Sequence, residues 1–133
     1  MTIITKDNYE DYMYYNGTVM DCDGQGVTEI RYLPEGLEYL FCRGNQLTSL
    51  PKLPKGLKVL WCCSNQLTSL PELPEVLKEL WCNRNQLTSL PELPESLKEL
   101  DCCINQITSL PNKPESLIRG YGWRDLPVIH KGE

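Results

Sequence analysis

Residues 61–80 read WCCSNQLTSLPELPEVLKEL, and the same pattern recurs at the same length in neighbouring parts of the chain. Five consecutive blocks of 20 residues follow it, beginning at Asp21, Phe41, Trp61, Trp81 and Asp101. A fixed period of this length indicates a stack of supersecondary units, each of which needs its neighbours to bury its apolar face. The sequence therefore predicts a solenoid.

Each block predicts one short strand. Leu60, Trp61 and Cys62 point alternately inward, outward and inward if the backbone has the period of two that is typical of strands. Five of the seven cysteines occupy the inward position of Cys62 in successive blocks, namely Cys22, Cys42, Cys62, Cys82 and Cys102. We interpret this column as small buried apolar residues, because free cysteine is among the most buried residue types. An odd number of cysteines without a secretory signal favours a reducing compartment.

The remainder of each block predicts a turn followed by an extended return path. An asparagine follows each strand, at Asn45, Asn65, Asn85 and Asn105. Its amide can bond the backbone groups that a tight turn leaves unpaired, so we assign it a structural role. Two prolines three residues apart, such as Pro71 and Pro74, then exclude a helix and favour extended or polyproline II backbone.

Together these features resemble the leucine-rich repeat, in the 20-residue form with a doubled Leu-Pro. That form occurs in bacterial type III effectors of the IpaH and YopM group, and related arrays occur in giant DNA viruses. The resemblance covers about residues 17–127. It implies a β-rich solenoid with one parallel sheet on the concave face and extended or polyproline II segments on the convex face. It also implies that the strand face binds a protein.

This chain departs from the pattern of those effectors in two ways. Cysteine stands where the repeats more often have leucine or valine. The ubiquitin-ligase members carry a separate catalytic domain after the repeats, and we expect no such domain in the few residues that follow the repeats here.

The whole chain, residues 1–133, is expected to form a single domain without an internal linker. We assign residues 1–16 to an N-terminal cap, residues 17–119 to the repeats and residues 120–133 to a C-terminal cap. Within the N-terminal cap, residues 7–15 predict a short helix, because Asp7 and Glu10 have capping-box spacing.

At the C-terminal end, Gly120 and Gly122 replace the inward leucine and cysteine of the earlier blocks. We therefore expect the last coil to be hollow and Trp123 to fold over it. Closing both ends is necessary, because an open end exposes core and unpaired strand groups.

Charge and hydropathy exclude some partners. A net charge of −5 and an isoelectric point near 4.9 argue against a nucleic-acid-binding surface, which needs clustered lysine and arginine. Neither a signal peptide nor an apolar run of ~18 residues is found, so we expect no membrane association. The predicted location is intracellular, in the cytoplasm of its own or of a host cell.

Protein binding is expected at the outward strand positions, because the inward positions form the core. The central column is aromatic and the later repeats are acidic. The predicted binding residues are Tyr39, Phe41, Val59, Trp61, Glu79, Trp81, Glu99, Asp101 and Tyr121. A second interpretation is that Phe41, Trp61 and Trp81 stack on one another and stabilise the sheet.

Catalysis has little support in the sequence. His130 is the only histidine and lies outside the repeats. Cys63 and Cys103 are expected to point outward, but no second histidine is available to activate either thiol. Their separation by two repeats disfavours a zinc site. We therefore predict no catalytic residue, no metal and no cofactor.

The sequence thus predicts a non-enzymatic protein-interaction module that binds a protein or a short segment on the concave strand face, with a host protein as one class of partner. Two alternatives remain open. One is a self-assembling structural protein that forms homo-oligomers. The other is a substrate-recognition arm that acts with a separate ubiquitin ligase.

Overall fold

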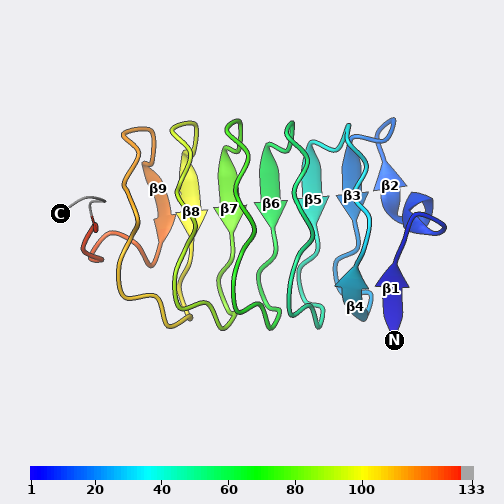
Figure 1. Cartoon of the computed structure of the whole chain (residues 1–133), viewed down its shortest axis with the longest axis horizontal. Coiled ribbons are helices and arrows are strands. Elements are labelled where there is room, and N and C mark those ends of the chain that lie inside the picture. Colours follow the sequence, from blue (N-terminus) through cyan, green and yellow to red (C-terminus); the bar gives the residue numbers. More distant parts are fainter. Residues whose placement is uncertain (130–133) are drawn as a thin grey trace.

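The computed structural model describes residues 1–129 and shows a solenoid of stacked coils with almost no helix. Each 20-residue block forms one coil, with a strand on one side and an irregular return segment on the other (Figure 1). The sheet runs in the order β2-β3-β5-β6-β7-β8-β9. Its parallel strands are β3 (Val19–Asp21), β5 (Tyr39–Phe41), β6 (Val59–Trp61), β7 (Glu79–Trp81), β8 (Glu99–Asp101) and β9 (Arg119–Tyr121). This is the predicted β-rich solenoid.

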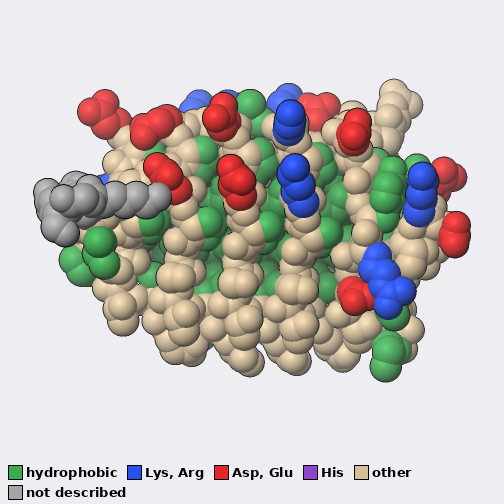
Figure 2. All heavy atoms as spheres, viewed as in Figure 1, with side chains coloured by type: hydrophobic (Ala, Val, Ile, Leu, Met, Phe, Trp, Pro, Cys, Tyr) green, Lys and Arg blue, Asp and Glu red, His purple; other side chains and the backbone are tan. Residues whose placement is uncertain are grey.

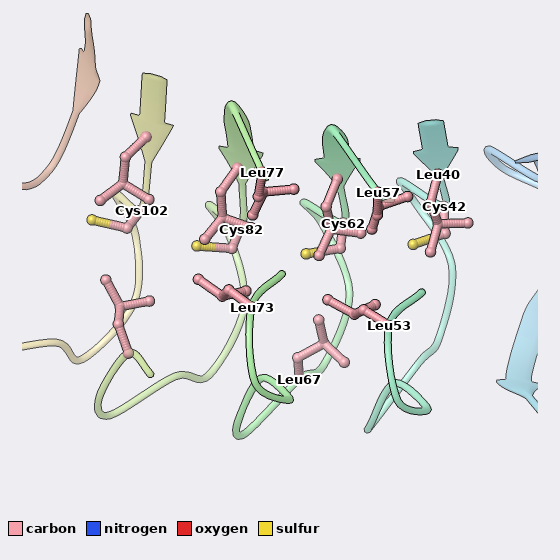
Figure 3. Packing of buried hydrophobic residues seen from close by; sticks show 14 of the residues in the cluster. Leu40, Cys42, Leu53, Leu57, Cys62, Leu67, Leu73, Leu77, Cys82 and Cys102 are labelled. Carbon is pink, nitrogen blue, oxygen red and sulfur yellow. The ribbon is translucent and has the colours of Figure 1, made fainter. Parts of the chain in front are cut away.

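The core is a single cluster that runs along the solenoid. Leu40, Leu60 and Leu80 of the strands are fully buried, as are the cysteines two residues further on in each block. Figure 3 shows the cysteine column facing leucines from the return segments, such as Leu53 and Leu73. All seven cysteines are free thiols. The prediction that the cysteine column packs the interior is confirmed.

The asparagine of each turn joins two successive coils. Asn65 Oδ1 accepts a hydrogen bond from the Leu47 backbone N–H at 3.0 Å. Asn65 Nδ2 donates to the carbonyl oxygens of Cys42 and Cys62 at 2.9 and 3.1 Å. Asn45, Asn85 and Asn105 repeat this pattern. The predicted structural role is confirmed, because each amide pairs backbone groups that the turn leaves without strand partners.

The return segments contain a turn that the proline pattern does not predict. In each repeat the backbone N–H of the leucine three residues after the last proline donates to the carbonyl of that proline, as Leu57 donates to Pro54 at 3.2 Å. Proline is compatible with the first position of such a turn because that position supplies only its carbonyl group, and proline lacks only the N–H. The return path is therefore extended only up to this point.

The N-terminal cap differs from the prediction. Residues 7–15 form only a short 3-10 helix, η1 (Tyr9–Tyr12), followed by β2 (Met13–Tyr14), which pairs antiparallel with β3. Instead of the expected capping box, the Asn8 side chain accepts from the Thr5 N–H at 2.7 Å and donates to the Ile3 carbonyl at 2.9 Å. These contacts and the strand pairing compete with a longer helix.

A second, two-stranded parallel sheet completes this end. β1 (Thr2–Ile4) pairs with β4 (Val27–Ile30), which lies in the first repeat (Figure 1). Ile4, Val27 and Ile30 are buried in the common core. The first coil is therefore covered by chain that belongs to no repeat.

Trp123 closes the C-terminal end as predicted. Its side chain is buried at 3% exposure, and its Nε1 donates to the Arg119 carbonyl at 3.3 Å. The hollow expected from Gly120 is absent, because a Cβ at this position would lie 1.8 Å from the Leu100 carbonyl oxygen. Glycine is needed there for close backbone approach and for a φ of +117°. His130 lies outside the described residues.

Candidate functional site

The outward residues of the six parallel strands, β3 and β5 to β9, form a continuous surface, which we call the sheet face. Because the strands pair in register, Phe41 lies beside Trp61, Trp61 beside Trp81, and Trp81 beside Asp101. Eight of the predicted binding residues are partly or largely exposed here: Tyr39, Phe41, Trp61, Glu79, Trp81, Glu99, Asp101 and Tyr121. The alternation of strand side chains brings them to one face.

Val59 is an exception among the predicted binding residues. Its exposed fraction is only 6%, whereas its neighbours in the column, Tyr39 and Glu79, are partly exposed. Larger side chains on both adjacent strands surround this short one. Val59 therefore has little surface with which to contact a partner, and we remove it from the candidate site.

An aromatic stack occupies the centre of the sheet face. The Phe41 and Trp61 ring centroids are 4.5 Å apart, and the rings of Trp61 and Trp81 are parallel within 5° at 4.1 Å. Contacts of this kind contribute about 0.5–1.5 kcal/mol per pair beyond the burial of area. The second interpretation of these residues is therefore confirmed: the rings stabilise the sheet by stacking across coils.

The Trp61 indole nitrogen is buried and has no hydrogen-bond partner of regular geometry. Burial raises the pKa of Glu79 above its ordinary value, and the hydrogen bond and charge of Glu99 raise it further. The Trp61 indole lowers this pKa, but by less. Glu79 and Glu99 lie side by side because they are register partners.

Ion pairs distinguish the two halves of the sheet face. In the N-terminal half, Arg43 forms a two-pronged interaction with Asp23, with Nε and Nη2 at 3.0 and 2.6 Å from Oδ2. The hydrogen bond to Asp23 raises the pKa of Arg43. The Arg43 Cζ also lies 4.7 Å from the Trp61 ring centroid. The pairing of Asp23 with Arg43 is not predicted from the sequence, because it depends on the register of adjacent coils.

Comparison with known proteins agrees with this geometry. The family description "Leucine Rich repeats (2 copies)" matches residues 35–75 and again residues 55–95. This chain carries leucine-rich repeats. No curated protein matches the sequence.

Three solved structures are similar to this leucine-rich repeat chain. The LRR domain of a Shigella effector is 35% identical with a TM-score of 0.80, and the match covers 86% of this chain and 52% of that domain. YopM from Yersinia enterocolitica WA-314 is 40% identical with a TM-score of 0.75, covering 79% of this chain and 23% of YopM. The leucine-rich effector YopM from Yersinia pestis is 36% identical with a TM-score of 0.78, covering 84% and 33%. This chain therefore spans about half the length of the Shigella domain.

The two outward thiols of the leucine-rich repeats are poorly activated. Burial raises the pKa of Cys63 more than the charge of Arg43 lowers it. At Cys103, burial raises the pKa first, and the hydrogen bond to Asp101, with Sγ 3.0 Å from Oδ1, raises it further. A nucleophilic or metal-binding cysteine needs the thiolate form. Within residues 1–129 no group of three or more histidine, cysteine or acidic side chains is placed to hold a metal ion.

The opposite, return face of the repeats carries charges in neighbouring coils, as Figure 2 shows. Glu72, Glu75, Glu92 and Glu95 line a shallow hollow of about 490 Å³ on two adjacent return segments. Lys52 and Lys55 lie in the preceding coil. Across the described residues, no helix has the length and apolar character that crossing a membrane requires. Within the described part of the chain, the return face has no aromatic cluster comparable to that of the sheet face.

Proposed function

We propose that this chain is a non-enzymatic interaction module that binds an extended segment of a partner protein on its sheet face. The observation that carries the proposal is the stack of Phe41, Trp61 and Trp81, which remains partly exposed at the centre of the surface. Aromatic side chains surrounded by polar residues are typical of the centre of recognition surfaces. The similarity to effector LRR domains supports an interaction module.

The size of the sheet face supports a short segment as the bound element. Six parallel strands spaced ~4.8 Å apart span less than ~30 Å, and each strand contributes few outward residues. A stable complex of two folded proteins buries about 800 Å² per partner. An extended segment lying across the strands fits the smaller area. Because the similar structures are of bacterial effectors, we place the partner among the proteins of a host cell.

The test compares proteins captured from a host-cell lysate by the immobilised chain and by a Trp61→Ala/Trp81→Ala variant, using quantitative mass spectrometry. If these rings are anchors, the variant should retain at least about tenfold less of the partner, since removal of an anchor costs ~2 kcal/mol or more. Circular dichroism shows whether the variant is folded.

Two further variants keep the test decisive if loss of the indoles unfolds the sheet. Glu99→Lys/Tyr121→Ala changes outward side chains only, and Tyr121 is 70% exposed. Lys52→Ala/Lys55→Ala changes the return face and should capture the partner normally. Unchanged capture by both sheet-face variants, or loss only in the return-face variant, would overturn the proposal.

A further inference from the structure

The aromatic stack ends at Trp81, and this leaves one face of its indole without an aromatic neighbour. Trp61 covers the other face at 4.1 Å. The next residue in the column is Asp101, whose short side chain cannot cover an indole ring. The Trp81 Nε1 donates to Glu99 Oε2 at 3.3 Å, so the ring is held beside a carboxylate. Trp81 thus presents a ring face between two acidic residues.

These acidic residues differ from those of the N-terminal half in their partners. Asp23 is paired with Arg43 at 2.6 Å, and Glu38 with Lys58 at 2.6 Å. Among the residues that the structure describes, no lysine or arginine nitrogen lies within 4 Å of a carboxylate oxygen of Glu79, Glu99 or Asp101. Arg119 follows Glu99 in register, and its charge only partly offsets the influences that raise the pKa of Glu79.

Arg43 shows within the same molecule how one guanidinium can contact both an indole ring and a carboxylate. Its guanidinium bonds the carboxylate of Asp23 while lying 4.7 Å from the Trp61 ring centroid. Arginine suits both contacts, because its planar fork matches a carboxylate and stacks on an aromatic ring. Cys63 and Asn83 occupy the position of Arg43 in the next two coils, so these coils supply no equivalent cation.

We propose that the segment bound on the sheet face carries an arginine whose guanidinium lies on the open face of Trp81, between Glu99 and Asp101. This inference rests on the proposed function and specifies the chemistry of the partner. The net negative charge of the chain favours the approach of a basic segment. The arginine of the partner would contact Trp81, Glu99 and Asp101 in the way that Arg43 contacts Trp61 and Asp23.

The probe is a short synthetic peptide with one arginine between apolar residues, compared with the same peptide carrying citrulline, which has nearly the same shape but no charge. Each is titrated into the full chain at low salt, and the Trp81 indole N–H resonance is followed by NMR. The arginine peptide should reach half-saturation at a concentration at least about fivefold lower, because a charged hydrogen-bonded contact is lost with citrulline.

A matched pair of variants assigns the effect to this position. Glu99→Gln/Asp101→Asn should abolish the preference for arginine, whereas Glu72→Gln/Glu75→Gln removes two charges from the return face and should preserve it. Equal half-saturation by the two peptides, no shift of Trp81 with either, or a preference that survives Glu99→Gln/Asp101→Asn would overturn the inference. If both peptides bind equally and Trp81→Ala abolishes the shifts that both cause in the Trp61 indole N–H resonance, the sheet face still binds segments and only the arginine assignment fails.

Discussion

The residue before the turn asparagine, or before Gln25 in the first repeat, adopts a left-handed backbone conformation in five successive repeats. Its φ is +62° and +65° at Gly24 and Gly44, and +58°, +57° and +56° at Ser64, Arg84 and Ile104. For a residue with a Cβ this conformation costs about 1–2 kcal/mol, and a β-branched side chain tolerates it least. The turn geometry is therefore common to all five repeats, although only two of them have the glycine that suits it.

Ile104→Gly should stabilise the protein by about 1 kcal/mol, because the strain at this position exceeds the entropic cost of glycine. The Ile104 side chain is 58% exposed, so little packing is lost. The midpoint of urea denaturation provides the measurement. Thr108→Gly, at an exposed position of the same repeat without a positive φ, should destabilise by about 0.5–1 kcal/mol. A decrease in the midpoint for both variants would show that position 104 is not strained.

The outward thiols should react slowly at neutral pH. Since the pKa values of Cys63 and Cys103 are raised, the thiolate fraction at pH 7 is smaller than in an unfolded peptide. Alkylation by iodoacetamide, followed by mass spectrometry, should therefore accelerate about tenfold per pH unit up to pH values above ~9. Asp101→Asn should increase the rate at Cys103 more than at Cys63, because Asp101 bonds the Cys103 thiol, whereas its charge is the smallest of the influences on the pKa of Cys63. A rate at pH 7 equal to that of an unfolded cysteine peptide would contradict this assignment.

At the scale of elements, the last strand of the sheet is closed by side chains. Arg124 donates to the carbonyl oxygens of Gly120 and Ile118 at 2.5 and 3.1 Å, and Trp123 donates to that of Arg119 at 3.3 Å. The Arg124 guanidinium also lies 4.7 Å from the Trp123 ring centroid. An edge strand with free carbonyl groups is a template for pairing with another chain. These contacts therefore disfavour end-to-end association through β9.

Arg124→Ala should promote self-association, since it releases two edge carbonyl groups for a strand of another copy. Sedimentation velocity should show an average size that increases with protein concentration for the variant more than for the parent chain. Arg84→Ala removes the same charge from an exposed turn and is the matched control. Identical sedimentation of the three proteins at all concentrations would mean that Arg124 does not protect the edge.

At the scale of the whole molecule, different structures close the two ends of one repeating core. β2 and the β1–β4 pair cover the first coil, whereas Trp123 and the bridge between Leu110 and Val128 cover the last. Charge also differs along the solenoid. The sheet face carries ion pairs near β3 to β6, whereas the carboxylates near β7 and β8 form no ion pair within residues 1–129. Because charge differs between the two ends of the sheet face, a bound segment can distinguish one end of the array from the other.

The repeats were predictable because each coil has nearly the same neighbours as the next. The inward positions of leucine and cysteine, the asparagine ladder and the aromatic column all follow from a 20-residue period. The structure of the N-terminal cap was not predictable, because residues 1–16 do not follow the repeat pattern. Their structure depends on contacts such as that between Asn8 and Ile3, which local propensity does not specify.

The sequence by itself determined the solenoid, its coil length and the side of the strand on which each repeat residue lies, because period and alternation are local properties of the chain. Only the tertiary structure decided that Val59 is covered, that Arg43 pairs with Asp23 and that no described lysine or arginine forms an ion pair with the carboxylates beside Trp81. These properties depend on the shapes and charges of side chains from adjacent coils, which contact one another only after the coils have stacked.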